Sequence, residues 1–383
     1  MTIRLFDQDV DLMYFTAHVL SCTPKGAQWE VVLDRTAFFP EGGGQGADHG
    51  TLGDAHVLDA QEKGGIIRHL TDAPLTEGST VEGHVEPVRR LSMMQQHTGE
   101  HILSGLICRL HGYRNVGFHI GTDAVTLDFN GPLTEEEIRH AEQLANECIW
   151  RDQPVEVWVP SPEELATLDY RSKKALEGDV RIVRIEGVDT CACCGTHVHT
   201  TGQVGQIKVI SAMNYKGGVR LSILCGMRAL EAENALLAEN RAARQTLSAK
   251  PGELAEATQR LLQERDELRL RCEQTGMRLF HLLAQAQQGE AVRIAEADML
   301  APSQLRKAAG ILAEGCRFGL ALLPRDAGWS FALCSQTEDV RPLARALSER
   351  FGGKCGGPAD MVQGVWSTGS MDAIRAAMQE LIS

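Results

Sequence analysis

The chain has 383 residues, of which 43% are hydrophobic and 23% are charged. These proportions are those of a folded globular protein, so wholesale disorder, a collagen-like repeat and a small disulfide-dependent scaffold are excluded, and the length predicts two to three domains. The 38 basic and 51 acidic residues give a net charge of −13. This charge argues against a protein that binds nucleic acid over its whole surface, but it allows a local basic site.

The cysteines and the N-terminus indicate the compartment. The 11 cysteines are odd in number and scattered apart from one cluster, which is not the pattern of a disulfide framework. Asp7 stands where a signal peptide would need an apolar core, and no apolar run approaches the ~18 residues of a membrane span. We therefore expect a cytoplasmic protein that does not contact a membrane.

The first part of the chain predicts two domains of different kinds. Short apolar runs between glycine-rich turns, such as residues 29–33, predict a small N-terminal β-domain in residues 1–88. In residues 89–226 helical stretches alternate with strand-like runs, which predicts an α+β domain. The expected helices cover residues 90–111 and 134–150, and the expected strands cover residues 124–129, 155–159, 180–185, 205–210 and 219–224.

The remaining residues predict a helical spacer followed by another mixed domain, so the overall fold class is α+β. Residues 227–288 are almost all strong helix formers, with one break at Pro251-Gly252. Leucines repeat every seven residues after this break, but the companion heptad row is polar, so a helical hairpin or spacer is favoured over a long coiled coil. Residues 289–383 predict a small C-terminal α/β domain. Its expected helices cover residues 303–314, 341–351 and 371–381, and its expected strands cover residues 318–323, 329–334 and 362–366.

Two histidines four residues apart form a candidate metal-binding pair. His97 and His101 lie in an apolar-periodic stretch, and side chains at this spacing stand on one face of a helix, so both imidazoles can reach a single ion. Glu100 completes a His-x-x-Glu-His string, the pattern of one class of metallopeptidase in which the glutamate is the general base. Chance histidine pairs at this spacing are common, so a structural role stays open for the pair taken alone.

A cluster of metal-ligand residue types follows at residues 191–197. Cys191, Cys193, Cys194 and His197 offer thiolates and an imidazole around Gly195. Zinc takes four nitrogen or sulfur ligands, commonly from two short ligand pairs far apart in the sequence, so this cluster and the histidine pair together predict a zinc site. A redox Cys-x-x-Cys pair or buried structural cysteines are the alternatives, but neither explains His197 or the distant histidine pair.

A glycine-rich loop stands between two strand-like stretches of the N-terminal domain. Three consecutive glycines, Gly42, Gly43 and Gly44, cost conformational entropy, and they permit positive φ angles and a close approach of backbone amides to a ligand. A strained turn is the alternative interpretation. A second glycine-dense segment, residues 351–358, has the same two interpretations.

These segments, in this order along the chain, resemble segments of a known family. Residues 38–45, residues 97–101 and the Cys-Cys-Gly-Thr-His string at 193–197 resemble the editing domain of alanyl-tRNA synthetase and its free-standing relatives, the alanyl-tRNA editing proteins. Residues 352–363 look like the glycine-rich motif of the C-terminal domain that follows editing in that synthetase. The helical segment stands where the family has its connector, so the resemblance covers nearly the whole chain, as the long form of the editing protein.

The resemblance implies particular site residues. The family pair is Cys-x-x-x-His, so the implied zinc ligands are His97, His101, Cys193 and His197. Cys191 and Cys194 are then extra thiols, and Cys194 stands where a glycine is more usual. The residues implied to lie near the aminoacylated end of tRNA are Gly42, Gly43, Gly44 and Gln45. No catalytic residue is carried over, and Glu100 is not a motif residue, so the resemblance implies no role for it as a base.

The function implied by the resemblance is trans-editing of tRNA-Ala. A pocket for a small amino acid cannot strongly exclude a slightly different one, so a second site must hydrolyse the errors, here seryl-tRNA-Ala and also glycyl-tRNA-Ala, with zinc as the cofactor. One rival is a tRNA-binding module with a structural zinc, because four protein ligands leave no open position. Another is a peptidase that uses Glu100, which a Cys-x-x-x-His pair in place of a carboxylate ligand disfavours. Residues after Met227 are expected to contribute tRNA affinity or self-association as a homodimer.

Overall fold

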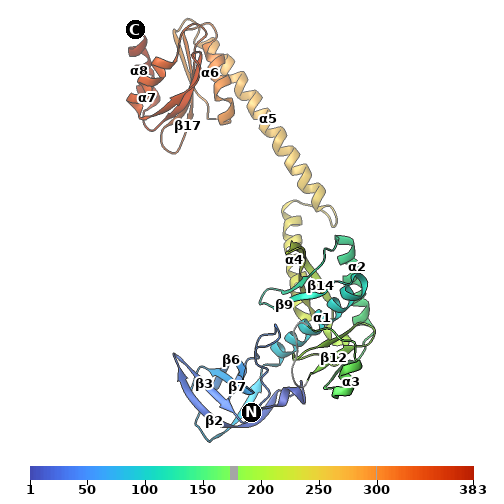
Figure 1. The fold of residues 1–383 in the computed structure, drawn as a ribbon. Coiled ribbons are helices and arrows are strands. Elements are labelled where there is room, and N and C mark those ends of the chain that lie inside the picture. Colours follow the sequence, from blue (N-terminus) through green and yellow to red (C-terminus); the bar gives the residue numbers. More distant parts are fainter. Residues whose placement is uncertain (173–179, 299) are drawn as a thin grey trace. The chain divides into compact units, whose positions relative to one another are not determined.

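A computed structural model describes residues 1–172, 180–298 and 300–383 (Figure 1). The chain divides into two compact units, Met1–Asn240 and Arg241–Ser383. The expected α+β fold class is confirmed, while the finer division into four domains stays a prediction. Three short 3-10 helices add to the elements given below, at Leu5–Asp7, Thr201–Val204 and Pro302–Gln304.

The first unit begins with a closed barrel, as expected for a small β-domain. Its six strands follow the order β2-β3-β7-β6-β5-β8 around the barrel. Buried and exposed side chains alternate along β2, where Phe15, Ala17 and Val19 point into the interior, because successive side chains of a strand face opposite sides. The strands of this region are β1 (Ile3–Arg4), β2 (Tyr14–Lys25), β3 (Gln28–Leu33), β4 (Arg35–Thr36), β5 (Gly50–Leu52), β6 (Ala55–Lys63), β7 (Ile66–Thr71) and β8 (Thr80–Val85).

The rest of the first unit packs two small sheets and two long helices around one core. One sheet has the order β14-β15-β10-β9 and the other β11-β12-β13, and all their pairings are antiparallel. Residues from α1, α2 and both sheets form a single hydrophobic cluster. The elements are α1 (Pro87–His111), β9 (Asn115–Ile120), β10 (Val125–Phe129), α2 (Glu135–Trp150), β11 (Val155–Trp158), α3 (Pro162–Thr167), β12 (Ile182–Ile185), β13 (Asp189–Ala192), β14 (Ile207–Tyr215) and β15 (Gly218–Cys225).

Local sequence signals set the ends of the two long helices. Pro87 occupies the first turn of α1, where its missing N–H costs nothing, and Gly112 ends the helix in the left-handed region at a φ of 72°. Thr134 and Glu137 form a capping box at the start of α2, in which each side chain bonds the backbone N–H of the other residue. Both helices therefore begin and end within a few residues of their predicted limits.

Two strands that the sequence did not predict lie next to the candidate site. β9 contains Gly117, which interrupts the strand pattern, and a Cβ there would meet the Asp128 carboxylate of the paired strand β10 at 2.7 Å. β13 covers the beginning of the cysteine cluster and forms by pairing with β12. Both strands depend on tertiary pairing rather than on a clear local periodicity.

A buried ion pair fastens α1 to the barrel. Arg90 is fully buried and donates to the Asp48 carboxylate and to the carbonyl oxygens of Val10 and Ala37, the latter two at 2.5 and 2.6 Å. Asp48 also accepts from the backbone N–H of Phe39 at 2.7 Å, just before the glycine-rich loop. Removal of one partner of a buried ion pair typically costs about 3–5 kcal/mol. This pair therefore fixes both the helix and the loop relative to the barrel.

The second unit contains a mixed five-stranded sheet, as expected for the C-terminal α/β domain. Its order is β16-β17-β18-β20-β19, with β16 parallel to β17 and the other pairs antiparallel. Helix α4 (Gly226–Thr246) ends and α5 (Leu254–Ala286) begins on either side of the predicted break at Pro251-Gly252. The other elements are β16 (Val292–Glu296), α6 (Leu305–Ala313), β17 (Phe318–Pro324), β18 (Trp329–Cys334), α7 (Arg341–Phe351), β19 (Gly353–Gly356), β20 (Met361–Trp366) and α8 (Met371–Ile382). Among the described residues, no helix combines the length and hydropathy needed to cross a bilayer.

Candidate metal centre

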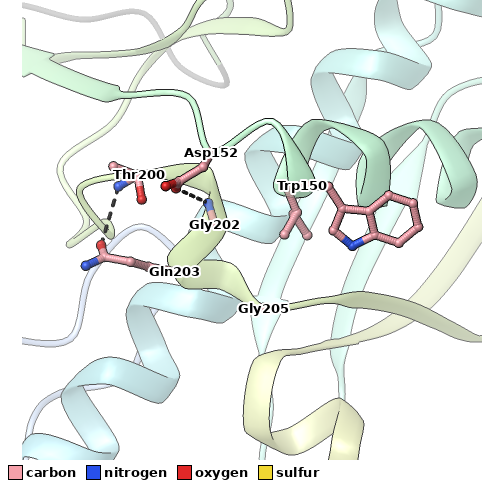
Figure 2. Close-up of a pocket in the computed structure, with 7 residues that line it drawn as sticks. Trp150, Asp152, Thr200, Gly202, Gln203 and Gly205 are labelled. Atoms are coloured by element: carbon pink, nitrogen blue, oxygen red, sulfur yellow. Dashed lines mark hydrogen bonds between the residues drawn. The ribbon is translucent and has the colours of Figure 1, made fainter.

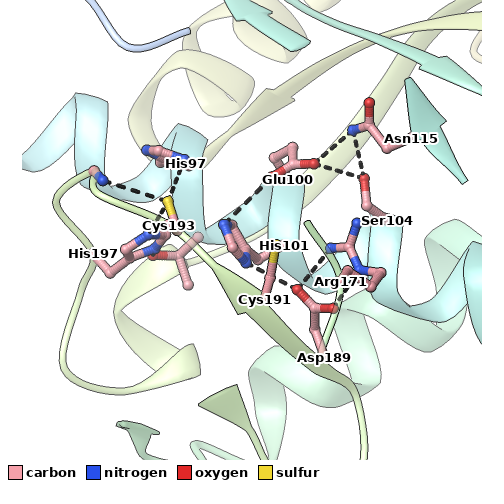
Figure 3. Close-up of polar contacts among 12 residues, drawn as sticks. His97, Glu100, His101, Ser104, Asn115, Arg171, Asp189, Cys191, Cys193 and His197 are labelled. Carbon is pink, nitrogen blue, oxygen red and sulfur yellow. Dashed lines mark hydrogen bonds and ion pairs between the residues drawn. The ribbon is translucent and has the colours of Figure 1, made fainter. Parts of the chain in front are cut away.

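The structure brings the four predicted ligands into one group. His97 and His101 stand one turn apart on α1, and Cys193 and His197 lie at the two ends of the turn that follows β13 (Figure 3). One potential ligand atom from each of the four residues lies within 4.8 Å of the others. The Nε2 atoms of His97 and His197 lie 3.3 and 3.4 Å from Sγ of Cys193. Four donors in so small a volume can hold a metal ion.

Each of the three histidines is oriented through its other ring nitrogen. Nδ1 of His97 donates to Oε1 of Gln45 at 2.8 Å, and Nδ1 of His101 donates to Oδ2 of Asp189 at 2.9 Å. Nδ1 of His197 lies 3.1 Å from the Thr98 hydroxyl. With the Nδ1 protons engaged in this way, the Nε2 lone pairs are available to an ion, which is the arrangement by which second partners orient metal-binding imidazoles.

The electrostatics of the group favour a thiolate surrounded by imidazoles. Burial alone would raise the pKa of Cys193, but His97 and His197 outweigh it and hold this pKa well below its ordinary value. Burial lowers the pKa of His197 to about 3, so this ring is neutral at pH 7. For His101 burial acts downward, but the hydrogen bond to Asp189 raises its pKa overall. A bound cation would replace the proton that this arrangement attracts.

A close backbone approach allows the cysteine turn to reach α1. A Cβ on Gly195 would lie 2.1 Å from Cε1 of His97, so no other residue fits at this position without displacing the ligand. The turn is further held by Arg181, which donates to the carbonyl oxygens of Cys193 and Gly195 at 3.0 and 2.8 Å. The glycine in the Cys-Cys-Gly-Thr-His string is therefore a packing requirement of the site.

The two other cysteines of the cluster stand apart from the four-residue group. Cys191 is buried, and burial raises the pKa of its thiol. It forms a second potential metal-binding trio with His101 and Asp189. In that trio the Asp189 carboxylate already accepts two bonds from Arg171, at 2.6 and 2.7 Å. Cys194 is an exposed residue, but neighbouring groups partly desolvate its sulfur, and this desolvation together with the negative charge of Cys193 raises the pKa of the thiol. Neither thiol therefore has the lowered pKa that favours the thiolate form of Cys193.

Glu100 lies beside the metal-binding group and is fully engaged there. It is buried, and its carboxylate accepts from the Ser104 hydroxyl at 2.8 Å and from Nδ2 of Asn115 at 2.6 Å. Its other oxygen lies 3.6 Å from Nε2 of His101. These contacts make Glu100 a neighbour that shapes the charge around His101.

The glycine-rich loop packs against the same group from the barrel side. Gly44 has a φ of 87°, and a Cβ there would lie 2.6 Å from the Phe118 ring, whose centroid is 4.9 Å from that of the tilted His97 ring. The carbonyl of Gly44 accepts from the N–H of Ile120 at 2.8 Å, so the loop is fixed to β9. Among the described residues, the N–H groups of Gly43 and Gly44 donate no hydrogen bond. These two amides are therefore available to a ligand.

Gln45 connects the barrel loop to two residues of the candidate centre. It is fully buried, and besides accepting from His97 it donates to the Thr196 hydroxyl at 2.8 Å. Both ends of its amide are thus used to hold His97 and the cysteine turn. Its direct contact with a tRNA end stays a prediction, whereas its contact with His97 is part of the structure.

Sequence reasoning missed the residues that orient the ligands. Asp189 and Arg171 lie outside the motifs: Asp189 is placed by the pairing of β12 with β13, and Arg171 by an isolated bridge to Cys191. Thr98 and Thr196 each adjoin a predicted ligand, and an isolated hydroxyl next to a histidine carries no recognisable signal. Of these orienting residues, the sequence analysis named only Gln45, which it expected near the aminoacylated end of tRNA.

A hollow near the end of α2 carries no metal-binding chemistry. Its volume is about 420 Å³, and Figure 2 shows the Asp152 carboxylate bonded to the N–H of Gly202 and the Gln203 side chain bonded to the N–H of Thr200. None of its lining residues is a histidine or a cysteine, although Trp150 on its rim is 74% exposed. This hollow therefore adds nothing to the centre described above.

Comparisons with known proteins show which families the chain is similar to. Residues 180–221 match the family described as the threonyl and alanyl tRNA synthetase second additional domain, and residues 10–89 match the family of class II (A) tRNA synthetases. The alanyl-tRNA editing protein AlaX-L of Pyrococcus horikoshii is 28% identical over 100% of this chain and 99% of its own length. This chain is similar to the alanyl-tRNA editing proteins along its whole length. The resemblance inferred from the motifs is thereby confirmed.

Other relatives differ in how much of their length this chain covers. The alanyl-tRNA editing protein Aarsd1 of Mus musculus is 33% identical over 57% of this chain and 57% of its own length. The alanine–tRNA ligase of Pyrococcus abyssi is 31% identical over 95% of this chain, but the chain spans only 42% of that ligase. The chain likewise spans 31% of the ligase of Ignicoccus hospitalis. The chain therefore corresponds to the whole of AlaX-L but to only part of each ligase.

Proposed function

We propose that this protein is a cytoplasmic aminoacyl-tRNA deacylase that hydrolyses the ester of mischarged tRNA-Ala, with seryl-tRNA-Ala and glycyl-tRNA-Ala as substrates. The observation that carries the proposal is the group of four donors, His97, His101, Cys193 and His197, within 4.8 Å of one another. The similarity to AlaX-L along the whole chain supports the same activity. Release of an amino acid from the wrong tRNA is required because binding alone discriminates poorly between small side chains.

The ion proposed for the centre is zinc. A tetrahedral site with Zn–N and Zn–S bonds of about 2.0–2.3 Å places neighbouring ligand atoms roughly 3.3–3.7 Å apart. The two distances from Cys193 Sγ to the imidazole nitrogens, 3.3 and 3.4 Å, are in this range. Three neutral imidazoles and one thiolate are a donor set that suits zinc, since hard cations prefer oxygen ligands.

The residues of this chain would bind and orient the ester. When bound, the ion supplies a Lewis acid for the carbonyl or the water, or a fixed point for the α-amino group. The free N–H groups of Gly43 and Gly44 would donate to an ester or ribose oxygen, since backbone amides aimed at developing negative charge stabilise acyl transfer. Gln45 and Asp189 would hold His97 and His101 in place during the reaction.

The decisive experiment measures deacylation of seryl-tRNA-Ala, glycyl-tRNA-Ala and alanyl-tRNA-Ala by the zinc-loaded protein. We expect hydrolysis of the first two and little of the third. Gly43→Val should lower the rate strongly, because the φ of Gly43 is 61° and its Cβ would approach Sγ of Cys194 at 3.4 Å. Gly64→Val is the matched control, since Gly64 has a φ of 63° in the turn between β6 and β7 with open space around it.

A tRNA-binding module with a structural metal is the second candidate. Four protein ligands fill a tetrahedral site, and the three histidines are each only about 2% exposed, which favours this candidate. It predicts tRNA binding without hydrolysis of any of the three aminoacyl-tRNAs. Equal hydrolysis of all three would instead indicate an unselective esterase and would overturn the editing proposal.

A further inference from the structure

A pocket of about 790 Å³ lies beside the C-terminal half of α1. Its walls come from α1, from the start of β9, from residues 169–172 and from the segment that joins β12 to β13. Three arginines line it, Arg109, Arg114 and Arg171, together with the aromatic ring of Tyr170. None of these residues was assigned a role by the motifs or by the centre described above, except that Arg171 supports Asp189.

Two of these arginines are unlike the other arginines of the first unit. Twelve arginines between residues 1 and 240 have a side-chain hydrogen bond or an ion pair, as with Arg184 and Glu156 or Arg220 and Asp128. Arg109 and Arg114 are exposed and have neither within the described ranges. Residues 1–226 carry 19 basic and 31 acidic side chains, so a free guanidinium would readily find an acidic partner there. Two unpaired cations in one pocket therefore indicate an anionic ligand.

The pocket shares two lining residues with the surroundings of the candidate metal centre. Asp189 and Asn115 line the pocket, and both are nine-tenths or more buried. Asp189 accepts from His101, and Asn115 donates to Glu100, as Figure 3 shows. Since Asp189 lines the pocket and contacts His101 directly, one side chain separates the pocket from the centre. A ligand in the pocket would thus lie close to the scissile ester of a substrate held at the centre.

We infer that this pocket binds a backbone phosphate of the single-stranded 3′ end of the substrate tRNA, through the guanidinium groups of Arg109 and Arg114. Guanidinium groups match phosphate oxygens in two-pronged geometry, and Tyr170 offers an aromatic face on which an unpaired base can stack. Arg171 remains paired with Asp189, so it lines the pocket without binding the phosphate. The inference rests on the proposed function, because it takes tRNA as the substrate.

The test compares kcat and KM for seryl-tRNA-Ala between the full chain and the variants Arg109→Gln, Arg114→Gln and the double variant. We expect each single substitution to raise KM by about tenfold, the loss that accompanies one charged hydrogen bond, with little change in kcat. The slope of log affinity for uncharged tRNA-Ala against log salt should fall by about 1 for each phosphate contact removed. Arg139→Gln is the matched control, since this exposed arginine pairs only with Glu135 one turn away on α2.

A truncated tRNA locates the contact. tRNA-Ala that lacks its 3′-terminal CCA should bind the wild type and the double variant equally, because the phosphate in question is then absent. Equal weakening of binding to intact and truncated tRNA would place the contact on the stem and would overturn the inference. Unchanged KM and salt slope in the double variant, relative to Arg139→Gln, would overturn it as well.

The two proposals fail in different ways. Arg109 and Arg114 are exposed, so both variants should unfold at the wild-type temperature. If the wild type hydrolyses seryl-tRNA-Ala and the double variant keeps its KM, the pocket has no such role and the editing proposal stands. If the wild type does not hydrolyse any aminoacyl-tRNA but the variants lose affinity and salt slope for intact tRNA alone, the phosphate contact stands and the editing proposal fails.

Discussion

At the scale of single residues, the difference between three neighbouring cysteines is set by what surrounds each sulfur. Cys193 lies among imidazole nitrogens that lower its pKa, whereas burial raises the pKa of the thiols of Cys191 and Cys194. A thiolate binds metal and a thiol does not. The cysteine that the family pattern implied is therefore also the one that the structure prepares for an ion.

Substitution of these cysteines should separate the ligand from its neighbours. Cys193→Ser should lose most of the bound metal, because the hydroxyl is not deprotonated at neutral pH and cannot replace the thiolate. Cys191→Ala should keep it, since that sulfur belongs to a trio whose carboxylate is already paired with Arg171. Elemental analysis of the purified variants provides the measurement. Full metal occupancy in Cys193→Ser would contradict the assignment.

His69 in the barrel predicts a pH dependence of stability that is independent of the metal. It is fully buried, its ring lies 2.9 Å from the Thr36 hydroxyl, and burial lowers its pKa to about 4. Between pH 4 and the ordinary value near 6.5 the unfolded chain binds more protons than the folded one, so stability falls as the pH decreases through this range. The contribution is complete above about pH 6.5 and amounts to roughly 3 kcal/mol.

The variant His69→Gln should remove that dependence. Urea unfolding at pH 7 and at pH 4.5 should show a smaller loss of unfolding free energy on acidification in the variant than in the wild type. All other titrating groups are the same in both proteins, so the difference between the two isolates His69. Equal losses would show that the ring titrates normally in the folded barrel.

At the scale of elements, α1 is the scaffold of the site, and its small residues decide how closely other elements approach. A Cβ on Gly105 would lie 2.5 Å from the carbonyl oxygen of Val188 and 2.6 Å from Cβ of Asp189. Backbone at such a distance cannot move without shifting β13, and Asp189 at its start orients His101. α1 therefore carries the candidate ligands His97 and His101, and Gly105, one turn later, sets how closely Asp189 approaches the helix.

Gly105→Ala should consequently destabilise the protein and weaken metal binding together. Overpacking of this kind costs about 1–3 kcal/mol, which exceeds the gain in helix propensity of up to about 1 kcal/mol. Gly310→Ala in α6 is the control, because open space surrounds that position and only the propensity gain remains. Thermal unfolding and competition with a chelator measure the two effects. A stabilised Gly105→Ala would show that β13 can move away without cost.

At the scale of the whole molecule, the residues of the candidate metal centre lie within one unit. All four predicted ligands belong to Met1–Asn240, and the second unit, Arg241–Ser383, has its own sheet and core clusters. A chain cut after Thr246, where α4 ends, should therefore keep its metal and its barrel. It should bind tRNA more weakly or lose self-association, which sedimentation and tRNA titration would show. Loss of the metal on truncation would contradict the conclusion that the first unit holds the metal centre without the second.

The sequence by itself determined the kinds of elements and the chemistry of the candidate ligands. Helical periodicity and the end signals Pro87 and Gly112 are local, so α1 was predicted nearly residue by residue, and the spacing of His97 and His101 fixed their common face. Only the tertiary structure decided how the ligands are held. Asp189 and Gln45 reach the histidines from β13 and from the barrel loop, across 88 and 52 residues of chain. The pocket, whose Arg109 and Arg114 have no side-chain partner among the described residues, likewise exists only where α1 meets β9 and β13, and no periodicity encodes such a meeting.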